Sequence, residues 1–357
     1  MFPDVPGSRD DQGNPRKGVH LFRTIDDVLA IRADAKGAKN ALVVGGGLLG
    51  LEAAKGLLDL GMHVTVLERA TSLMKRQLDD TGGKMLAMQL GAMGLEIELT
   101  CAIQEAMGDE RVDSVVLEDG RILPADLLVF SCGIVPRVEL AREAGFLVNR
   151  GVVVNPWLAI DGRENHFAIG ECAECLGEVP GMVAPSWQHA RIAARTLLGQ
   201  SCAPYRIERT YAKLKVSGVD VASMGNVEYE DARDEVVQVI ESQKLRYRKL
   251  IARGGKLVGA QFVGDVSAAS RVVGWLDRGD ALPDNPCDIL ASDDAMASTG
   301  SPGDREVCNC ERVSEKTIKE AIVSGAKSVA DVSAKTRACT GCGSCKGEVQ
   351  RLVAQVG

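Results

Sequence analysis

The stretch ALVVGGGLLG at residues 41–50 decides the fold of this chain. An apolar run leads into the glycines and helical spacing follows from Leu49 to Leu60, so a strand, a turn and a helix are expected in that order. In this context Gly45, Gly47 and Gly50, spaced G-x-G-x-x-G, are typical of a dinucleotide-binding turn. They provide a tight turn, close approach of the backbone to pyrophosphate, and close packing of helix on strand. The helix N-terminus attracts the pyrophosphate charge.

Glu68 ends the next expected strand and is the expected acceptor for the adenosine ribose 2′-hydroxyl. A carboxylate at this place repels a 2′-phosphate, so NAD(H) is favoured over NADP(H). Arg69 can weaken that preference, since a neighbouring guanidinium is how some sites of this kind accept the extra phosphate. A plain strand–helix turn is the alternative interpretation of the glycines, but the strand, the helix and the acidic residue together favour a nucleotide site.

Strands and helices alternate beyond the glycine turn, with strands expected at residues 63–67 and 95–99 and a helix at 80–93. Such alternation predicts a parallel, doubly wound α/β sheet of the Rossmann type. Residues 204–280 contain alternating runs that meet at Gly254-Gly255, which is typical of an antiparallel sheet in a small α+β domain. The other expected elements are strands at residues 151–154 and 166–169 and a helix at 188–198.

Composition and charge exclude several classes of function. The formal net charge of −7 and the lack of a basic stripe argue against a nucleic-acid surface. The most apolar stretch, residues 41–61, contains Glu52, Lys55 and Asp59, so no membrane span is expected. Residues 1–7 lack the basic start and apolar core of a signal peptide, which predicts a cytoplasmic location. No hydrolase triad or H-E-x-x-H motif is present, and no catalytic residue is assigned.

The cysteines give a second strong signal. Five of the 11 lie between Cys308 and Cys345, and such clustering in a cytoplasmic protein indicates metal or redox chemistry. A C-x-C pair is followed by a C-x-x-C pair, with Cys339 as a spare thiol. Thiolates suit an iron–sulfur cluster, and structural zinc is the competing interpretation, disfavoured because C-x-C is cramped for tetrahedral zinc. The candidate ligands are Cys308, Cys310, Cys342 and Cys345.

The runs at residues 42–69, 130–136 (FSCGIVP) and 167–173 (FAIGECA) resemble the FAD/NAD-linked reductase family. The resemblance implies that Gly133 and Pro136 lie near a flavin, and that Gly170 and Glu171 bind the ribityl-phosphate part of FAD. Glu in a position where most members have Asp resembles the nitrite reductase branch. The family's N-terminal fingerprint for the ADP half of FAD is missing, so this chain alone is expected to hold FAD weakly or not at all.

The C-terminal cysteine spacing is similar to that of bacterioferritin-associated ferredoxin and of the matching module in nitrite reductase large subunits, which implies one 2Fe–2S cluster. The resemblance also implies an order of domains. These are a remnant of the FAD domain at residues 1–38, an NAD-binding Rossmann domain at 39–125, the second part of the FAD domain at 126–203, an α+β interface domain at 204–300 and a small helical 2Fe–2S domain at 301–357.

These features together imply a function in electron transfer. A hydride carries two electrons and a 2Fe–2S cluster accepts one, so a flavin is expected between NAD(P)H and the cluster. The resemblance implies an oxidoreductase for nitrite reduction in nitrogen assimilation, with a partner chain or domain that carries sirohaem or the missing FAD segment. Two alternatives stay open: a non-catalytic iron–sulfur and NAD-binding module that docks on a partner such as bacterioferritin, and a reductase for a small ferredoxin or rubredoxin.

Overall fold

The computed structural model describes most of the chain as two compact units. The larger unit comprises residues 4–131 and 210–357, and the smaller comprises residues 132–209 with 1–3. The described residues are 2–160, 165–207, 211–216, 218–228, 232–279, 281–283, 285–290, 306–308, 311, 313–340 and 345–356.

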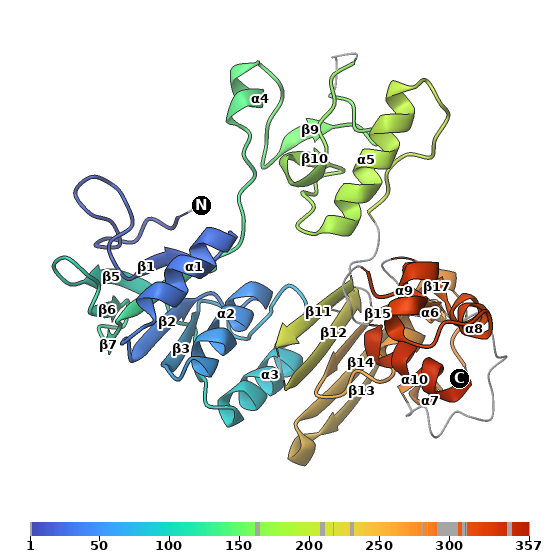
Figure 1. Ribbon diagram of the computed structural model, residues 1–357. Helices are drawn as coiled ribbons and strands as arrows, with labels where there is room; N and C mark the ends of the chain where they lie inside the picture. The colour runs from blue at the N-terminus through green and yellow to red at the C-terminus, as the bar shows by residue number, and fades with distance from the viewer. Residues whose placement is uncertain are drawn as a thin grey trace. The chain divides into compact units, whose positions relative to one another are not determined.

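A five-stranded parallel sheet lies at one end of the larger unit (Figure 1). Helix α2 (Leu48–Asp59) and helix α3 (Asp80–Ala92) connect successive strands of this sheet. Every residue of strand β8 (Leu127–Phe130), which lies inside this sheet, is buried, as expected where both faces of a parallel sheet are covered. The prediction of an α/β fold with a doubly wound Rossmann-type sheet is therefore confirmed. The strand order is β1 (Val19–Leu21), β8 (Leu127–Phe130), β2 (Asn40–Val44), β3 (His63–Glu68) and β4 (Glu96–Leu99).

Two antiparallel sheets, of three and five strands, accompany the parallel one. A three-stranded sheet contains β5 (Ile103–Met107), β6 (Ser114–Leu117) and β7 (Ile122–Pro124). In the larger sheet, Gly254 and Gly255 make the predicted turn between β14 (Arg246–Arg253) and β15 (Lys256–Val263), and both glycines have positive φ. Helix α6 (Ala269–Arg278) packs on that sheet. Its strand order is β11 (Tyr211–Val216), β12 (Val219–Gly225), β15 (Lys256–Val263), β14 (Arg246–Arg253) and β13 (Asp234–Glu241).

The parallel sheet and the larger antiparallel sheet share one hydrophobic core. Val66 of β3 and Leu86 of α3 lie in the same buried cluster as Val221 of β12, Tyr247 of β14 and Val263 of β15. Burial of apolar surface from both sheets stabilises their contact. Helix α3 is therefore in direct contact with residues that are far from it in sequence.

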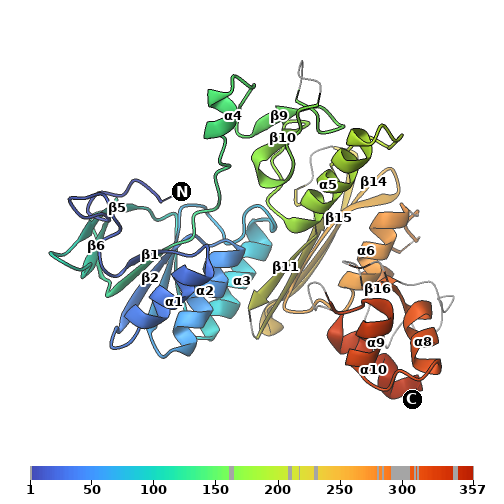
Figure 2. The same ribbon diagram turned by 45° about the horizontal axis from the view of Figure 1, so that its top comes forward.

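The C-terminal part of the larger unit is a small helical group (Figure 2). A short ribbon of β16 (Glu306–Cys308) and β17 (Val313–Ser314) leads into α8 (Glu315–Val323), α9 (Val329–Thr336) and α10 (Lys346–Val356). The side chains of Ser314 and Ser328 accept hydrogen bonds from backbone N–H groups in the first turns of α8 and α9, which fixes where these helices begin. None of the described helices has the length and apolar content needed to cross a lipid bilayer.

The smaller unit contains a two-stranded parallel sheet of β9 (Val152–Val154) and β10 (Ala173–Cys175), with the short helices α4 (Glu139–Glu143) and η1 (Gly170–Cys172). The expected strand at 166–169 is wrong. There the chain makes only an isolated bridge between Phe167 and Ala159, and the turn at Gly170 brings the following residues beside β9 instead.

Helix α5 (Val183–Leu197) of the smaller unit begins five residues before the expected start at residue 188. Pro185 lies in its first turn. A proline is tolerated there because the first N–H groups of a helix have no partner within the helix.

Candidate nucleotide, flavin and cluster sites

The three fingerprint glycines differ in what surrounds them. Gly45 has a φ of 115°, which favours glycine. A Cβ atom on Gly50 would lie 1.9 Å from the carbonyl oxygen of Gly45, so α2 approaches the strand end closely only because that atom is missing. A Cβ atom on Gly47 would meet nothing within 4 Å. The three glycines thus have the properties that a dinucleotide-binding turn needs: a tight turn at Gly45, open space for a ligand at Gly47 and close packing at Gly50. Their contact with a nucleotide stays a prediction.

The N-terminus of α2, unlike those of α1 (Ile25–Asp34) and α3, has no side-chain cap. Helix α1 is capped by the side chain of Thr24, and α3 by the side chain of Asp79. Gly47, at the N-cap of α2, has no side chain, and the first turn of α2 contains no acidic residue. The N–H groups of this turn and the positive end of the helix dipole are thus available to an anion. The glycine turn therefore fits a pyrophosphate.

The carboxylate of Glu68 lies at the end of β3 and is held on the glycine turn. Its Oε2 atom accepts a hydrogen bond of 2.6 Å from the backbone N–H of Gly46, and Oε1 accepts one of 2.8 Å from Ala70. A carboxylate oxygen can accept more than one hydrogen bond, so both atoms can still receive a ribose hydroxyl. Gly46 was not singled out in the sequence. A Cβ atom there would lie 2.5 Å from Leu73 Cδ2 and 3.0 Å from Glu68 Oε2.

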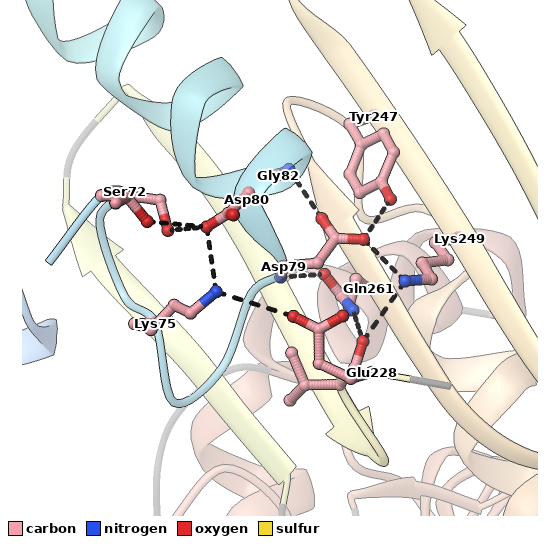
Figure 3. Close-up of polar contacts among 11 residues, drawn as sticks. Ser72, Lys75, Asp79, Asp80, Gly82, Glu228, Tyr247, Lys249 and Gln261 are labelled. Atoms are coloured by element: carbon pink, nitrogen blue, oxygen red, sulfur yellow. Dashed lines mark hydrogen bonds and ion pairs between the residues drawn. The ribbon is translucent and has the colours of Figure 1, made fainter. Parts of the chain in front are cut away.

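A buried polar cluster, which no sequence pattern predicted, lies at the start of α3 (Figure 3). Asp79 Oδ2 accepts hydrogen bonds of 2.7 Å from both Tyr247 Oη and Lys249 Nζ, and Oδ1 accepts one of 2.8 Å from the N–H of Gly82. The backbone N–H of Asp79 donates to Gln261 Oε1 at 2.9 Å. Burial and the contact with Asp79 raise the pKa of Tyr247, so the phenol stays protonated. We call these residues, with Asp79 at the centre, the Asp79 cluster.

An exposed ion-pair group lies beside the Asp79 cluster (Figure 3). Lys75 Nζ lies 2.9 Å from Asp80 Oδ1 and 3.7 Å from Glu228 Oε1. The hydrogen bond from Lys75, followed by that from Ser72, lowers the pKa of Asp80 to about 2. The same contact with Asp80 raises the pKa of Lys75. This group and the Asp79 cluster fix the segment between β3 and α3 at two adjacent points.

The candidate flavin residues lie in the smaller unit. Gly133 and Gly170 have φ angles of 87° and 74°, and a Cβ atom on Gly133 would meet nothing within 4 Å. The N–H of Gly170 donates to Nδ1 of the buried His189 at 3.3 Å, which places the proton of a neutral ring on Nε2. Burial lowers the pKa of His189, and Nε2 has no hydrogen-bond partner among the described residues. Glu171 follows in the half-buried turn η1. The turns at Gly133 and Gly170 are accessible, and Nε2 of His189 is a buried donor with no partner among the described residues. These features fit a polar ligand.

The candidate cluster ligands fall partly within the described residues. Cys308, at the end of β16, and Cys345, just before α10, are both buried in the helical group. Cys339 Sγ lies 3.4 Å from Cys345 Sγ, and burial followed by this contact raises the pKa of Cys345 to about 11. Cys310 and Cys342 lie outside the described residues.

In the described part of the chain no three His, Cys, Asp or Glu side chains form a metal-binding group. Two of the four candidate ligands are nevertheless buried in the same small apolar core. A buried thiol becomes a thiolate readily when a metal cation balances its charge. The donors present therefore fit a thiolate-bound metal centre.

Comparisons with known proteins cover nearly the whole chain. Residues 1–196 match the family described as pyridine nucleotide-disulphide oxidoreductase, residues 211–279 match the rubredoxin NAD+ reductase C-terminal domain, and residues 306–355 match the BFD-like [2Fe-2S] binding domain. The first and third matches confirm the predicted set of cofactors: a nicotinamide nucleotide, FAD and a 2Fe–2S cluster. Zinc is thus the less supported interpretation of the cysteines.

Two relatives from Bacillus subtilis (strain 168) extend the comparison. The nitrite reductase [NAD(P)H] is 38% identical over 347 residues, which are 96% of this chain and 43% of the relative. The assimilatory nitrate reductase electron transfer subunit is 34% identical over 343 residues, 96% of this chain and 44% of the relative. The chain thus spans less than half the length of each. A ferredoxin reductase from Rhodopseudomonas palustris has a similar structure, with a TM-score of 0.67 and 26% identity over 79% of this chain and 69% of that one.

Proposed function

The chain belongs to the pyridine nucleotide-disulphide oxidoreductase family, and from this premise we propose that it is an electron-transfer oxidoreductase that uses NADH, FAD and a 2Fe–2S cluster. One observation carries the proposal: a single chain combines an uncapped glycine turn, held by Glu68, with buried thiols in a cluster-binding domain. When bound, the nicotinamide supplies a hydride, the flavin separates its two electrons, and the cluster accepts them singly.

In this proposal the glycine turn and Glu68 bind and select the nucleotide. The N–H groups at the start of α2 bind the pyrophosphate above Gly47, and Gly45 and Gly50 keep strand and helix close enough for this contact. Glu68, fixed by Gly46 and Ala70, accepts the ribose hydroxyl and repels a 2′-phosphate. The proposed preference is therefore for NADH over NADPH.

The remaining candidate residues hold the other two groups. Gly133 and Pro136 line the flavin, and Gly170 and Glu171 bind its ribityl-phosphate part. His189 keeps the turn at Gly170 in place through the hydrogen bond from the Gly170 N–H to its Nδ1 atom. Burial around the thiolates limits access of water to the metal centre. The proposed cluster ligands are Cys308, Cys310, Cys342 and Cys345.

The proposed electron acceptor is a nitrite-reducing centre in nitrogen assimilation. The names of the two Bacillus subtilis relatives support it, as do their sequence identities of 38% and 34% in alignments that cover 96% of this chain. A sirohaem-bearing chain or domain is the proposed partner, and the cytoplasm, where thiols stay reduced, is the proposed location. The match of residues 211–279 to a rubredoxin NAD+ reductase domain favours a second candidate acceptor, a small ferredoxin or rubredoxin.

The test is anaerobic purification with reconstitution of iron and sulfide, followed by NADH-driven reduction of a one-electron dye with and without added FAD. We expect coloured protein, an EPR signal after reduction, and turnover that requires added FAD. Colourless, iron-free and EPR-silent protein would overturn the proposal. A cluster that NADH does not reduce, even with FAD, would favour a non-catalytic carrier module. Comparison of nitrite reductase partners with small ferredoxins as acceptors then separates the two candidates.

A further inference from the structure

The Asp79 cluster is almost completely buried. Side-chain exposure is 2% for Lys249 and 8% for Asp79, while Tyr247 and Gln261 are completely buried. A buried ion pair contributes little net stability compared with apolar residues of the same size, because both charges lose their water. What it does supply is a fixed position, because every strong acceptor and donor must keep its partner. The cluster therefore fixes Asp79, and with it the start of α3, on strands β14 and β15.

A short hydrogen-bonded segment leads from Asp79 back to the glycine turn. The N–H of Leu78, which precedes Asp79, donates to the carbonyl oxygen of Met74 at 2.8 Å. The N–H of Met74 donates to the carbonyl oxygen of Gly46 at 2.9 Å. Met74 has a φ of 52°, a backbone conformation that residues other than glycine rarely adopt. Gly46 in turn donates its N–H to Glu68. Residues 74–79 thus form a closed turn with Gly46 at one end and the Asp79 cluster at the other.

Two consecutive glycines let α3 pack closely against Tyr247 of β14 on one side and against Leu73, which precedes the turn at residues 74–79, on the other. A Cβ atom on Gly82 would lie 3.2 Å from the ring of Tyr247, and one on Gly83 would lie 2.6 Å from the carbonyl oxygen of Leu73. Leu73 is fully buried, and its side chain reaches the space beside Gly46. Glycine lowers helix propensity, so a pair of them in the first turns of α3 fits a need for close contact on both sides.

We propose that Lys249 and Tyr247 are positioning residues for the nicotinamide nucleotide, which they influence through Asp79 and the turn at residues 74–79. This inference rests on the proposed nucleotide site. The antiparallel sheet holds Asp79, the turn holds Gly46, and Gly46 orients both the carboxylate of Glu68 and the backbone next to Gly47. Side chains of β14 thereby contribute to the affinity for NADH.

The test compares Lys249→Met and Tyr247→Phe with the control Arg253→Met. Arg253 lies four residues beyond Lys249 on the same strand β14, beside the turn at Gly254-Gly255, and forms an ion pair with Asp234 at 2.7 Å. The measurements are the Kd for NADH by titration calorimetry and the hydrogen exchange rate of the Met74 amide. We expect Lys249→Met to raise the Kd about 5- to 10-fold, Tyr247→Phe to raise it less, and both to speed exchange at Met74. Arg253→Met should change neither.

An unchanged Kd in folded Lys249→Met and Tyr247→Phe protein would overturn the inference, as would an equal effect of Arg253→Met. If Lys249→Met does not fold, Tyr247→Phe decides, because it removes one hydroxyl and leaves the ion pair in place. Failure of the unaltered chain to bind NADH is a different result, which would count against the proposed nucleotide site itself.

Discussion

The carboxylate of Glu68 accepts a 2.6 Å hydrogen bond from the backbone N–H of Gly46, inside the turn that it is expected to serve. The acid proposed to select the nucleotide and the glycines proposed to bind its pyrophosphate are thus one rigid arrangement. A ribose hydroxyl bound at Glu68 would therefore find the pyrophosphate site already in place, which reduces the ordering needed on binding.

Glu68→Gln should weaken NADH binding and reduce discrimination against NADPH. The glutamine amide has one oxygen for two backbone donors, Gly46 and Ala70. Its NH₂ group must therefore face one of these two backbone N–H groups. Loss of a charged acceptor costs about 1.5 kcal/mol or more, roughly tenfold in Kd. Calorimetric titration with NADH and NADPH measures both effects. Glu96→Gln, at an exposed residue on β4, is the control. An unaltered ratio of the two Kd values would contradict the prediction.

Two substitutions to alanine should separate ligand contact from packing. The Cβ atom of Gly47→Ala enters open space, so the free energy of unfolding should change little while NADH binds more weakly. The Cβ atom of Gly50→Ala meets the carbonyl oxygen of Gly45 at 1.9 Å, so α2 must shift and the chain should lose about 1–3 kcal/mol of stability. Urea unfolding and NADH titration of both variants check this. Normal NADH affinity in Gly47→Ala would exclude the open side of the turn as the binding surface.

The glycine turn could be predicted from sequence because all its parts lie within one strand–turn–helix segment. The Asp79 cluster could not, because Asp79, Tyr247, Lys249 and Gln261 come from three distant segments. In the run Tyr247-Arg248-Lys249, strand alternation places Lys249 on the same face as Tyr247, yet a lysine is almost never buried without a partner. The one local signal was Gly82-Gly83 at the start of an expected helix, since paired glycines there indicate close packing.

The smaller unit shows a second limit. The apolar pattern at residues 166–169 resembles a strand, but whether a short apolar run pairs depends on which neighbour is available. Gly170, with its positive φ, turns the chain so that Ala173–Cys175 takes the place beside β9. The family resemblance predicts a ligand contact at Gly170, whereas the effect of this glycine on the neighbouring strand depends on its backbone conformation in the fold.

Cys345→Ser and Cys339→Ser should differ in their effect on the metal centre. Cys345 is buried next to Cys308 and is a candidate ligand, so its serine variant should lose most of the iron and the visible absorption. Cys339, the spare thiol 3.4 Å away, should tolerate serine. Iron and sulfide analysis and EPR of reduced protein distinguish them. Retention of a normal cluster in Cys345→Ser with loss in Cys339→Ser would assign the ligand to Cys339 instead.

Asp80 should contribute to the acid sensitivity of the fold. Its pKa is about 2 in the folded chain against 3.8 for the ordinary group, chiefly because of Lys75. The unfolded chain therefore takes up the proton first, and the contribution, complete above about pH 4, is lost as the pH falls towards 2. Asp80→Asn should show a shallower loss of stability between pH 5 and pH 2 in urea unfolding. Asp59→Asn, at an exposed site on α2, is the control; equal pH slopes in Asp80→Asn and the unaltered chain would refute the prediction.

The losses of unfolding free energy caused by removing the two charges of the Asp79 cluster should be strongly non-additive. Lys249→Met leaves the Asp79 carboxylate buried without a cation and should cost about 3–5 kcal/mol. Adding Asp79→Asn removes that charge and keeps a side chain that can cap α3 at Gly82, so the double variant should recover much of the loss. Urea unfolding of both single variants and the double variant gives the coupling energy. Additive losses would mean that the two charges stabilise the fold separately, through other contacts, and that the pair does not hold α3 against the sheet.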